Sequence, residues 1–78
     1  MKYVYILNSV EGDHFYVGIT EDLGARLALH NSGSVPHTSK YKPWRIKTYV
    51  AFSDPDQAFK FEKYLKSPSG RAFSKKRL

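Results

Sequence analysis

"YVYILNSVEGDHFYVGIT", residues Tyr3–Thr20, contains two runs of alternating residues on either side of a polar segment. The runs, Lys2–Asn8 and Phe15–Thr20, are rich in tyrosine, valine and isoleucine, the residue types that favour strands. The segment between them, "VEGD" at Val10–Asp13, is typical of a turn. The stretch therefore predicts a β-hairpin, and the hairpin decides how the rest of the chain can pack.

The pairing register of this hairpin decides whether Tyr5 and Tyr16 meet, because side chains alternate between the two faces of a sheet. A loop with an even number of residues puts both tyrosines on one face, and an odd loop separates them. A two-residue turn at Glu11–Gly12, for instance, sets Tyr5 opposite Gly18. The same register sets Leu7 opposite Tyr16, which makes the tyrosines diagonal neighbours. Aromatic packing across the strands would be a sufficient reason for such a pair.

The residues after the hairpin predict a helix and then a third strand. Thr20 can cap the helix, with Glu21 and Asp22 in the first turn, where the helix dipole favours acidic side chains. The helix runs to about Asn31, because "NSG" favours termination. Trp44–Phe52 alternates again and predicts a strand whose even-numbered residues share one face.

A second helix is predicted from "SDPDQ" onward. Asp54 suits the N-cap, Pro55 suits the first helical position, and the helix continues to about Lys66. "SPSG" breaks it, and "RAFSKKRL" forms a short final turn or helix. The order ββαβα predicts an α+β fold, a three-stranded antiparallel or mixed sheet with helices packed on it. Residues 1–78 are expected to form a single domain, with 67–78 as a basic C-terminal extension.

The composition and the N-terminal residues exclude some kinds of site and some classes of protein. Cysteine is absent from the 78 residues, which excludes disulfides and thiolate metal sites. The N-terminal "MKYVYILNSV" matches neither a signal peptide nor a membrane span. A cytoplasmic protein without membrane association is therefore expected.

The net charge of +6 is distributed unevenly. One basic cluster surrounds Trp44, and a second extends from Lys60 to the C-terminus. Basic clusters interleaved with aromatic residues favour a polyanionic partner, most simply nucleic acid, although a solvated basic surface is the alternative. The residues predicted to contact the substrate are the small Gly18 beside Tyr5 and, from the basic clusters, Lys40, Lys42, Trp44, Arg45, Lys75, Lys76 and Arg77.

Charged residues occur where the helices are expected to be apolar. At about 100° per residue, Arg26 and His30 fall inside the leucine stripe of the first helix, and Glu62 is flanked by apolar neighbours in the second. Arginine and glutamate are rarely buried without a partner, because desolvating a charge costs several kcal/mol. Two interpretations remain open: an Arg26–Glu62 salt bridge with His30 at its boundary, or a functional site.

Four segments together carry a resemblance to a known family. They are "YVY" (Tyr3–Tyr5), "YVG" (Tyr16–Gly18), "GARLALHN" (Gly24–Asn31) and "FEKYL" (Phe61–Leu65). Their order and spacing resemble the GIY-YIG nuclease family, and in particular its short, stand-alone bacterial members. The resemblance covers nearly the whole chain.

The resemblance implies a role for each matching residue. Tyr5 and Tyr16 match the two tyrosines of the family motif. Arg26 matches the catalytic arginine, and His30 matches the histidine one helical turn later. Glu62 matches the single metal-binding glutamate. Arg26, His30 and Glu62 are also the residues whose helical positions are unexpectedly polar.

The chain departs from the family pattern at a few positions. Tyr3 replaces the first glycine of the motif, and Val4 and Val17 replace isoleucines. The asparagine that many members carry after the glutamate helix has no counterpart here.

The activity that the resemblance implies is metal-dependent endonucleolytic hydrolysis of DNA. Tyr5 would act as general base with His30 drawing off its proton, Tyr16 would orient water or phosphate, and Arg26 would stabilise charge on the phosphate. One Mg²⁺ or Mn²⁺ would be held by Glu62. DNA is the expected partner, with a further protein as a source of specificity; the oligomeric state is not indicated. The alternative is a nucleic-acid-binding module without catalysis.

Overall fold

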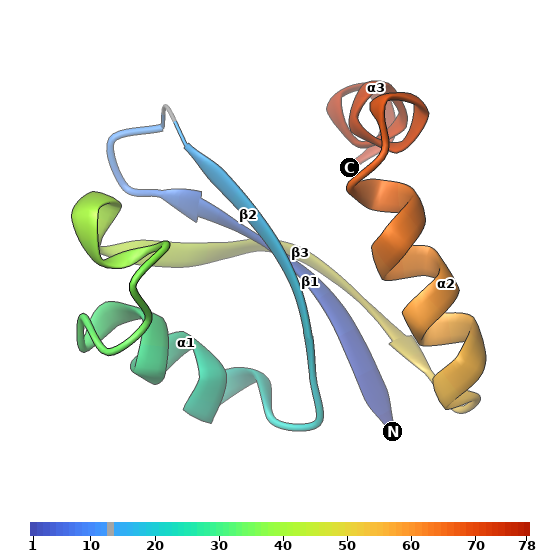
Figure 1. The fold of residues 1–78 in the computed structure, drawn as a ribbon, viewed down its shortest axis with the longest axis horizontal. Helices are drawn as coiled ribbons and strands as arrows, with labels where there is room; N and C mark the ends of the chain where they lie inside the picture. Colours follow the sequence, from blue (N-terminus) through green and yellow to red (C-terminus); the bar gives the residue numbers. More distant parts are fainter. Residues whose placement is uncertain (13) are drawn as a thin grey trace.

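A three-stranded antiparallel sheet in the order β2-β1-β3, with helices packed around it, forms the fold (Figure 1). The computed structural model describes residues 1–12 and 14–78. Within these ranges no helix has the length and apolar character needed to cross a membrane. The α+β class is confirmed, and the sheet is antiparallel throughout. Its elements are β1 (Lys2–Ser9), β2 (Phe15–Thr20), α1 (Leu23–Asn31), the 3₁₀ turn η1 (Ser39–Tyr41), β3 (Trp44–Phe52), α2 (Pro55–Leu65) and α3 (Pro68–Arg77).

Of the two parities open to the hairpin loop, the structure has the even one. Tyr5 lies opposite Gly18, and Leu7 lies opposite Tyr16. The backbone N–H of Ser9 donates to the carbonyl of His14 at 2.9 Å and closes the hairpin. Part of the predicted turn, Asp13, lies outside the described residues. Because the loop has an even number of residues, the two tyrosines project from the same face of the sheet.

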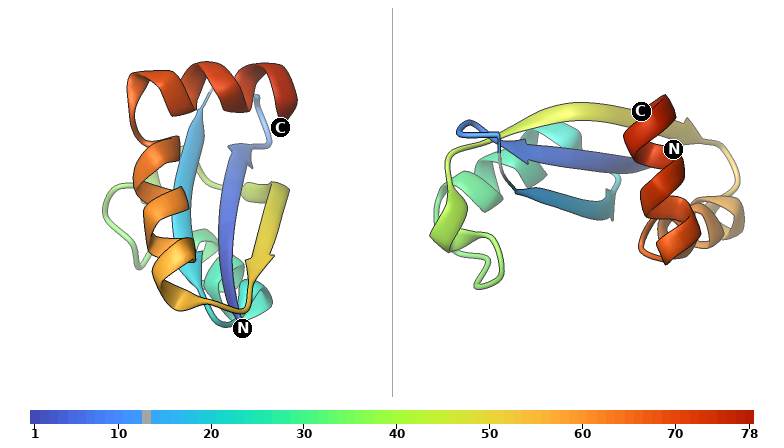
Figure 2. Two further views of the ribbon diagram at one scale, coloured as in Figure 1. Left: turned by 90° about the vertical axis from the view of Figure 1, so that its right-hand side faces the viewer. Right: turned by 90° about the horizontal axis from the view of Figure 1, so that it is seen from above.

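The central strand β1 is buried on both of its faces, so the sheet separates two apolar clusters. Val4 and Ile6 pack with Ala58 and Leu65 of α2 on one face. Tyr5 and Leu7 pack with Trp44 on the other face, which α1 covers with Leu23 and Leu27. Figure 2 shows α1 and α2 at different sides of the sheet. These apolar contacts place Tyr5 on the α1 side of the sheet.

The prediction that the even-numbered residues of β3 share one face is wrong, because a β-bulge interrupts the strand. Ile6 pairs with Thr48, whereas its neighbour Leu7 pairs with Ile46, so Lys47 is the extra residue. Adjacent residues of β1 point to opposite faces, and directly paired residues share a face. Ile46 therefore lies on the α1 side, whereas Thr48 lies on the α2 side.

The first helix begins later than its sequence predicts. Asp22, not Thr20, is the N-cap, and its side chain accepts a hydrogen bond from the N–H of Ala25 at 3.0 Å. Thr20 is still the last residue of β2, and its hydroxyl accepts from the N–H of Asp22 at 3.1 Å. The predicted cap of α2 is confirmed, because the side chain of Asp54 accepts from the N–H of Asp56 at 2.9 Å.

The basic C-terminal segment forms the helix α3, which packs against the end of α2 and begins earlier than expected. Ser67 caps α3 by accepting from the N–H of Gly70 at 3.1 Å, and Pro68 occupies the first turn. Gly70 is buried, and a Cβ at this position would overlap the carbonyl of Tyr64 at the end of α2. This close approach lets α3 turn sharply from α2 and cross one end of the sheet (Figure 2).

Gly70→Ala is expected to destabilise the fold. The added methyl group has no space against the Tyr64 carbonyl, and such overpacking typically costs about 1–3 kcal/mol of unfolding free energy. Gly24→Ala is the matched control, since Gly24 also lies in the first turn of a helix but its added Cβ meets only ordinary contacts. Urea denaturation of both variants would measure the difference. Equal stability of the two variants would contradict the tight α2–α3 contact.

Candidate active site

The phenol of Tyr5 lies at the centre of a small group of polar side chains on the α1 side of the sheet. Its oxygen is 3.0 Å from Nε2 of His30 and accepts a hydrogen bond from Nε of Arg26 at 3.4 Å. Gly18 makes the space, because a Cβ there would overlap the Tyr5 hydroxyl. The hairpin register and one face of α1 thus bring three of the predicted residues together around one oxygen atom.

His30 is held from its other side by the loop between α1 and β3. Its Nδ1 lies 2.9 Å from the hydroxyl of Thr38, which donates to the carbonyl of Val35 at 3.4 Å. A hydroxyl has only one proton to donate, so the contact with Val35 favours the assignment in which Thr38 accepts from Nδ1–H of His30. Nε2 then carries no proton and accepts from the hydroxyl of Tyr5. This tautomer makes His30 the proton acceptor of the pair.

Trp44 and Asn31 hold this loop in place. The indole N–H of Trp44 donates to the carbonyl of Thr38 at 2.8 Å. The side chain of Asn31, the last residue of α1, donates to the carbonyl of Trp44 at 3.0 Å and accepts from its N–H. The end of α1, the loop and the start of β3 are therefore linked by consecutive hydrogen bonds behind His30.

Tyr16 completes the aromatic wall of the site. Its ring centroid is 4.9 Å from that of His30 and 6.5 Å from that of Tyr5. Tyr16 is half-buried, whereas Tyr5 is only 2% exposed. Of the two tyrosines, Tyr16 is therefore the one with more access to solvent.

The environment shifts the proton affinities of the group in opposite directions. Burial raises the pKa of Tyr5 above its ordinary value near 10.0, and the Arg26 guanidinium offsets part of that rise. Burial, together with the charge of Arg26, lowers the pKa of His30. The hydrogen bond to Tyr5 raises the pKa of Arg26. At neutral pH the group therefore contains a protonated phenol, a neutral imidazole and a guanidinium.

Glu62 projects from α2, and its charge contributes to the raised pKa of Tyr5. Its carboxylate pairs with Nζ of Lys66 at 3.1 Å, one turn further along the chain. Among the described residues Arg26 instead contacts Tyr5, so the alternative of an Arg26–Glu62 salt bridge is wrong. The Glu62 side chain is 17% exposed and the Lys66 side chain 50%, which leaves the carboxylate accessible once the lysine moves.

Few side chains of the described residues could join Glu62 in holding a divalent cation. In the part of the chain that the structure describes, no group of three histidine, cysteine, aspartate or glutamate side chains could enclose a metal ion. A cation at Glu62 would thus have at most two such side chains as ligands, one of them Glu62. Mg²⁺ fits such a position, because it commonly retains several waters and binds substrate phosphate directly.

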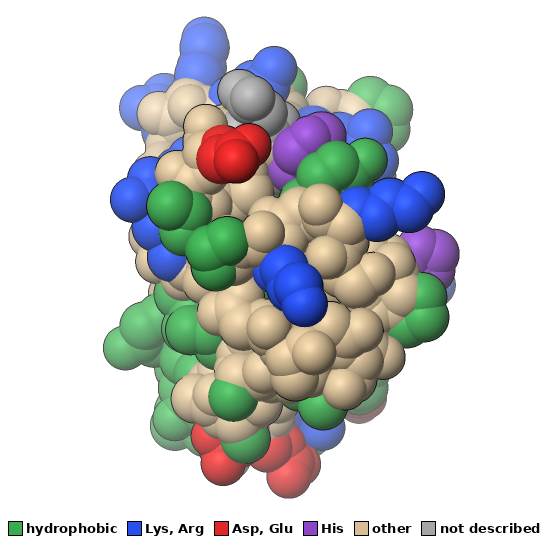
Figure 3. Space-filling view, turned by 90° about the vertical axis from the view of Figure 1, so that its left-hand side faces the viewer, with side chains coloured by type: hydrophobic (Ala, Val, Ile, Leu, Met, Phe, Trp, Pro, Cys, Tyr) green, Lys and Arg blue, Asp and Glu red, His purple; other side chains and the backbone are tan. Residues whose placement is uncertain are grey.

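The predicted substrate-contacting residues divide into exposed and buried ones. Trp44 is only 4% exposed and packs in the core, so its predicted place on a binding surface is wrong. Gly18 is also buried, against Tyr5. Figure 3 shows one face of the molecule, where lysine and arginine side chains lie mainly at the upper part and edges and acidic ones mainly at the lower end. The exposed members of the predicted set are Lys40, Lys42, Arg45, Lys75, Lys76 and Arg77.

Sequence reasoning missed three residues that shape the site: Thr38, Asn31 and Lys66. Thr38 lies in a polar loop, where hydropathy has no period that would single out one hydroxyl. Asn31 was interpreted only as part of a helix stop. Lys66 could have been found from its spacing, because a glutamate and a lysine four residues apart on a helix commonly pair.

Comparisons with known proteins place the chain in a family. A family model described as the GIY-YIG catalytic domain matches residues 1–77. A UPF0213 protein of Cupriavidus necator is 39% identical over 75 residues, which cover 91% of this chain and 80% of that protein. A UPF0213 protein of Lacticaseibacillus paracasei is 37% identical over 65 residues, 82% of this chain and 72% of the relative. The solution NMR structure of a UPF0213 protein from Bacillus halodurans has a TM-score of 0.57 at 32% identity, covering 96% of this chain and 81% of that one.

Thr38→Val is expected to lower the free energy of unfolding by about 1–3 kcal/mol, because the buried Nδ1–H of His30 loses its acceptor. Thr38→Ser keeps the hydroxyl and is the matched control. Chemical denaturation compares the two variants. If the valine and serine variants are equally stable, the Thr38 hydroxyl does not hold the His30 imidazole in place.

The stability of the protein is expected to fall on acidification through His30. The folded state has the lower pKa, so the contribution is complete above the unfolded value of about 6.5 and is lost as pH falls toward the folded pKa. The slope can reach about 1.4 kcal/mol per pH unit. His30→Gln should flatten this slope in denaturation curves recorded from about pH 7 to about pH 5. His37→Gln, at an exposed position, should leave it unchanged.

Proposed function

The chain belongs to the GIY-YIG family, and on that premise we propose that it is a metal-dependent endonuclease that hydrolyses phosphodiester bonds in DNA. The observation that carries the proposal is the contact of the Tyr5 hydroxyl with both His30 and Arg26. A phenol between a proton acceptor and a cation is suited to remove a proton from a nucleophilic water.

Tyr5 is the general base in this proposal, and His30 makes it competent. Because its pKa is raised, the phenol is protonated in the resting protein and cannot accept a proton directly. Nε2 of His30, neutral and 3.0 Å away, takes the phenolic proton as Tyr5 takes one from water. Thr38 supports the step, because its hydroxyl accepts the Nδ1–H bond that strengthens as the imidazole becomes charged.

Arg26 stabilises the negative charge that develops during hydrolysis. Its Nε–H already donates to the Tyr5 oxygen and stabilises a phenolate there. The other guanidinium nitrogens are suited to a phosphate oxygen, on which charge accumulates as water attacks. Tyr16, half-buried beside both Tyr5 and His30, is placed to orient the water or the phosphate.

Glu62 would hold one Mg²⁺ or Mn²⁺ in place of its ion pair with Lys66. Such an ion supplies charge stabilisation at the phosphate and at the leaving oxygen. Lys66, once released, remains next to the substrate as a counter-charge for phosphate. The exposed cations of α3 and of the loop before β3 supply sequence-independent contacts to the DNA backbone.

A second candidate function is nucleic-acid binding without cleavage. The Glu62–Lys66 ion pair favours it, because the proposed metal ligand already has a partner. The two functions differ in a single assay: a binder retains affinity for DNA and leaves it intact with or without divalent metal.

The proposed nuclease should nick DNA only when Mg²⁺ or Mn²⁺ is present. Glu62→Gln should abolish the metal-dependent cleavage and leave the fold and most of the DNA affinity intact. Tyr5→Phe should slow cleavage by about 10²–10⁴-fold, the usual contribution of a general base. Gel assays on duplex, single-stranded, flap and branched DNA would measure both effects.

The matched control for this experiment is Glu21→Gln, because Glu21 is an exposed glutamate that also pairs with a lysine, Lys2. It should cleave like the unmodified protein. Cleavage that persists without metal, or that survives Glu62→Gln, would refute the proposed role of Glu62.

A further inference from the structure

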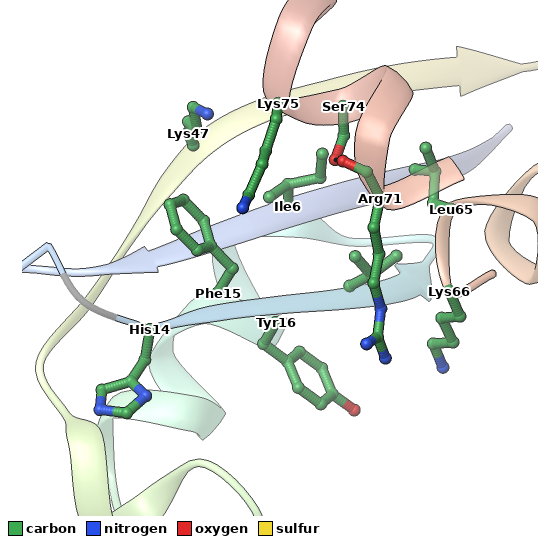
Figure 4. A pocket seen from close by; sticks show the side chains of 11 residues that line it. Ile6, His14, Phe15, Tyr16, Lys47, Leu65, Lys66, Arg71, Ser74 and Lys75 are labelled. Atoms are coloured by element: carbon green, nitrogen blue, oxygen red, sulfur yellow. Dashed lines mark hydrogen bonds between the residues drawn. The ribbon is translucent and has the colours of Figure 1, made fainter. Parts of the chain in front are cut away.

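A pocket of about 540 Å³ lies between β2 and α3, beside the candidate active site (Figure 4). Its walls come from all three strands of the sheet, from the end of α2 and from α3. The residues that give it its chemistry are Phe15, Tyr16, Lys47, Lys66, Arg71 and Lys75.

The pocket combines cations with an accessible aromatic ring. Among the described residues that line it, four are lysine or arginine (Lys47, Lys66, Arg71, Lys75) and none is acidic. Phe15 is 54% exposed, and Nζ of Lys47 lies 5.1 Å from its ring centroid. A ligand that suits this lining has a negative group and a flat apolar group, which is the chemistry of a nucleotide.

The pocket adjoins the candidate active site through two shared residues. Tyr16 lines the pocket and also stands 4.9 Å from the ring of His30. Lys66 lines it and pairs with Glu62. Figure 4 shows the Tyr16 hydroxyl at the end of the pocket where Arg71 and Lys66 extend, with Phe15 toward the other end near Lys75. A DNA strand held beside Tyr16 and Lys66 can therefore continue into the pocket.

We propose that this pocket binds one unpaired nucleotide of the DNA strand, adjacent to the phosphate held at the active site. Its phosphate lies against Lys66 and Arg71, and its base lies against Phe15. The nucleotide is unpaired because a base in a duplex has both faces covered by its stacked neighbours, so Phe15 can meet a base face only after unstacking. The volume agrees, since pockets for small organic ligands span about 300–1,000 Å³. Its position next to a scissile phosphate rests on the proposed function.

The test is binding of a fluorescein-labelled oligothymidylate, measured by anisotropy in EDTA with Tyr5→Phe protein so that no cleavage occurs. Adding Phe15→Ala should weaken this binding about tenfold, the usual effect of losing one stacked base. Affinity for a blunt duplex of the same length should change by less than about twofold. Phe59→Ala is the matched control, because Phe59 is 48% exposed but lies on α2 outside the pocket, and it should change neither affinity.

Arg71→Gln tests the phosphate end of the pocket independently. It should weaken oligothymidylate binding and reduce the slope of log affinity against log salt by up to about one, the value of one lost phosphate contact. Arg77→Gln, on the same helix but outside the pocket lining, should have a smaller effect on single-stranded DNA.

The outcomes separate this inference from the proposed function. Equal loss of single-strand and duplex affinity in Phe15→Ala, or no loss in either, would overturn the nucleotide pocket even if the unmodified protein cleaves DNA with metal. Selective loss of single-strand affinity in a protein that never cleaves would support the pocket and refute the nuclease.

Discussion

The burial of one phenolic hydroxyl determines how the rest of the structure is arranged. The oxygen of Tyr5 fits under the hairpin because Gly18 faces it, and it is buried with Arg26 and His30 as its partners. A buried hydroxyl without partners is costly, so α1 has to present a polar pair at this point of its apolar face. The polar interruption of the first helix and the glycine in the second strand are thus two consequences of one requirement.

Further hydrogen bonds hold the partners of the Tyr5 oxygen in place. His30 needs an acceptor at Nδ1, which Thr38 supplies, and the loop carrying Thr38 is held by the indole of Trp44. Asn31 then ties the start of β3 to the end of α1. The β-bulge at Lys47 keeps Ile46 on the α1 side while Thr48 faces α2, so one strand serves both clusters.

Much of the fold followed from local rules, whereas the outer part of the site did not. Strand alternation limited the hairpin to two parities without choosing between them, whereas helical periodicity singled out Arg26 and His30 within the apolar stripe. A bulge changes parity without changing the alternation of residue types, so the two faces of β3 were not predictable. The burial of Trp44 depends on a hydrogen bond to a loop carbonyl, which composition does not encode. The roles of the site residues remain proposals that follow from family membership and from this geometry.

The central claim is that His30 is neutral with its free electron pair directed at Tyr5, and ¹⁵N chemical shifts of its imidazole test that claim without depending on catalysis. The account predicts a protonated Nδ1 and an unprotonated Nε2 near neutral pH, with the Nδ1 proton protected from exchange by Thr38. A proton on Nε2 at that pH, in either the other tautomer or the imidazolium, would contradict it, because Tyr5 could then not pass its proton to His30.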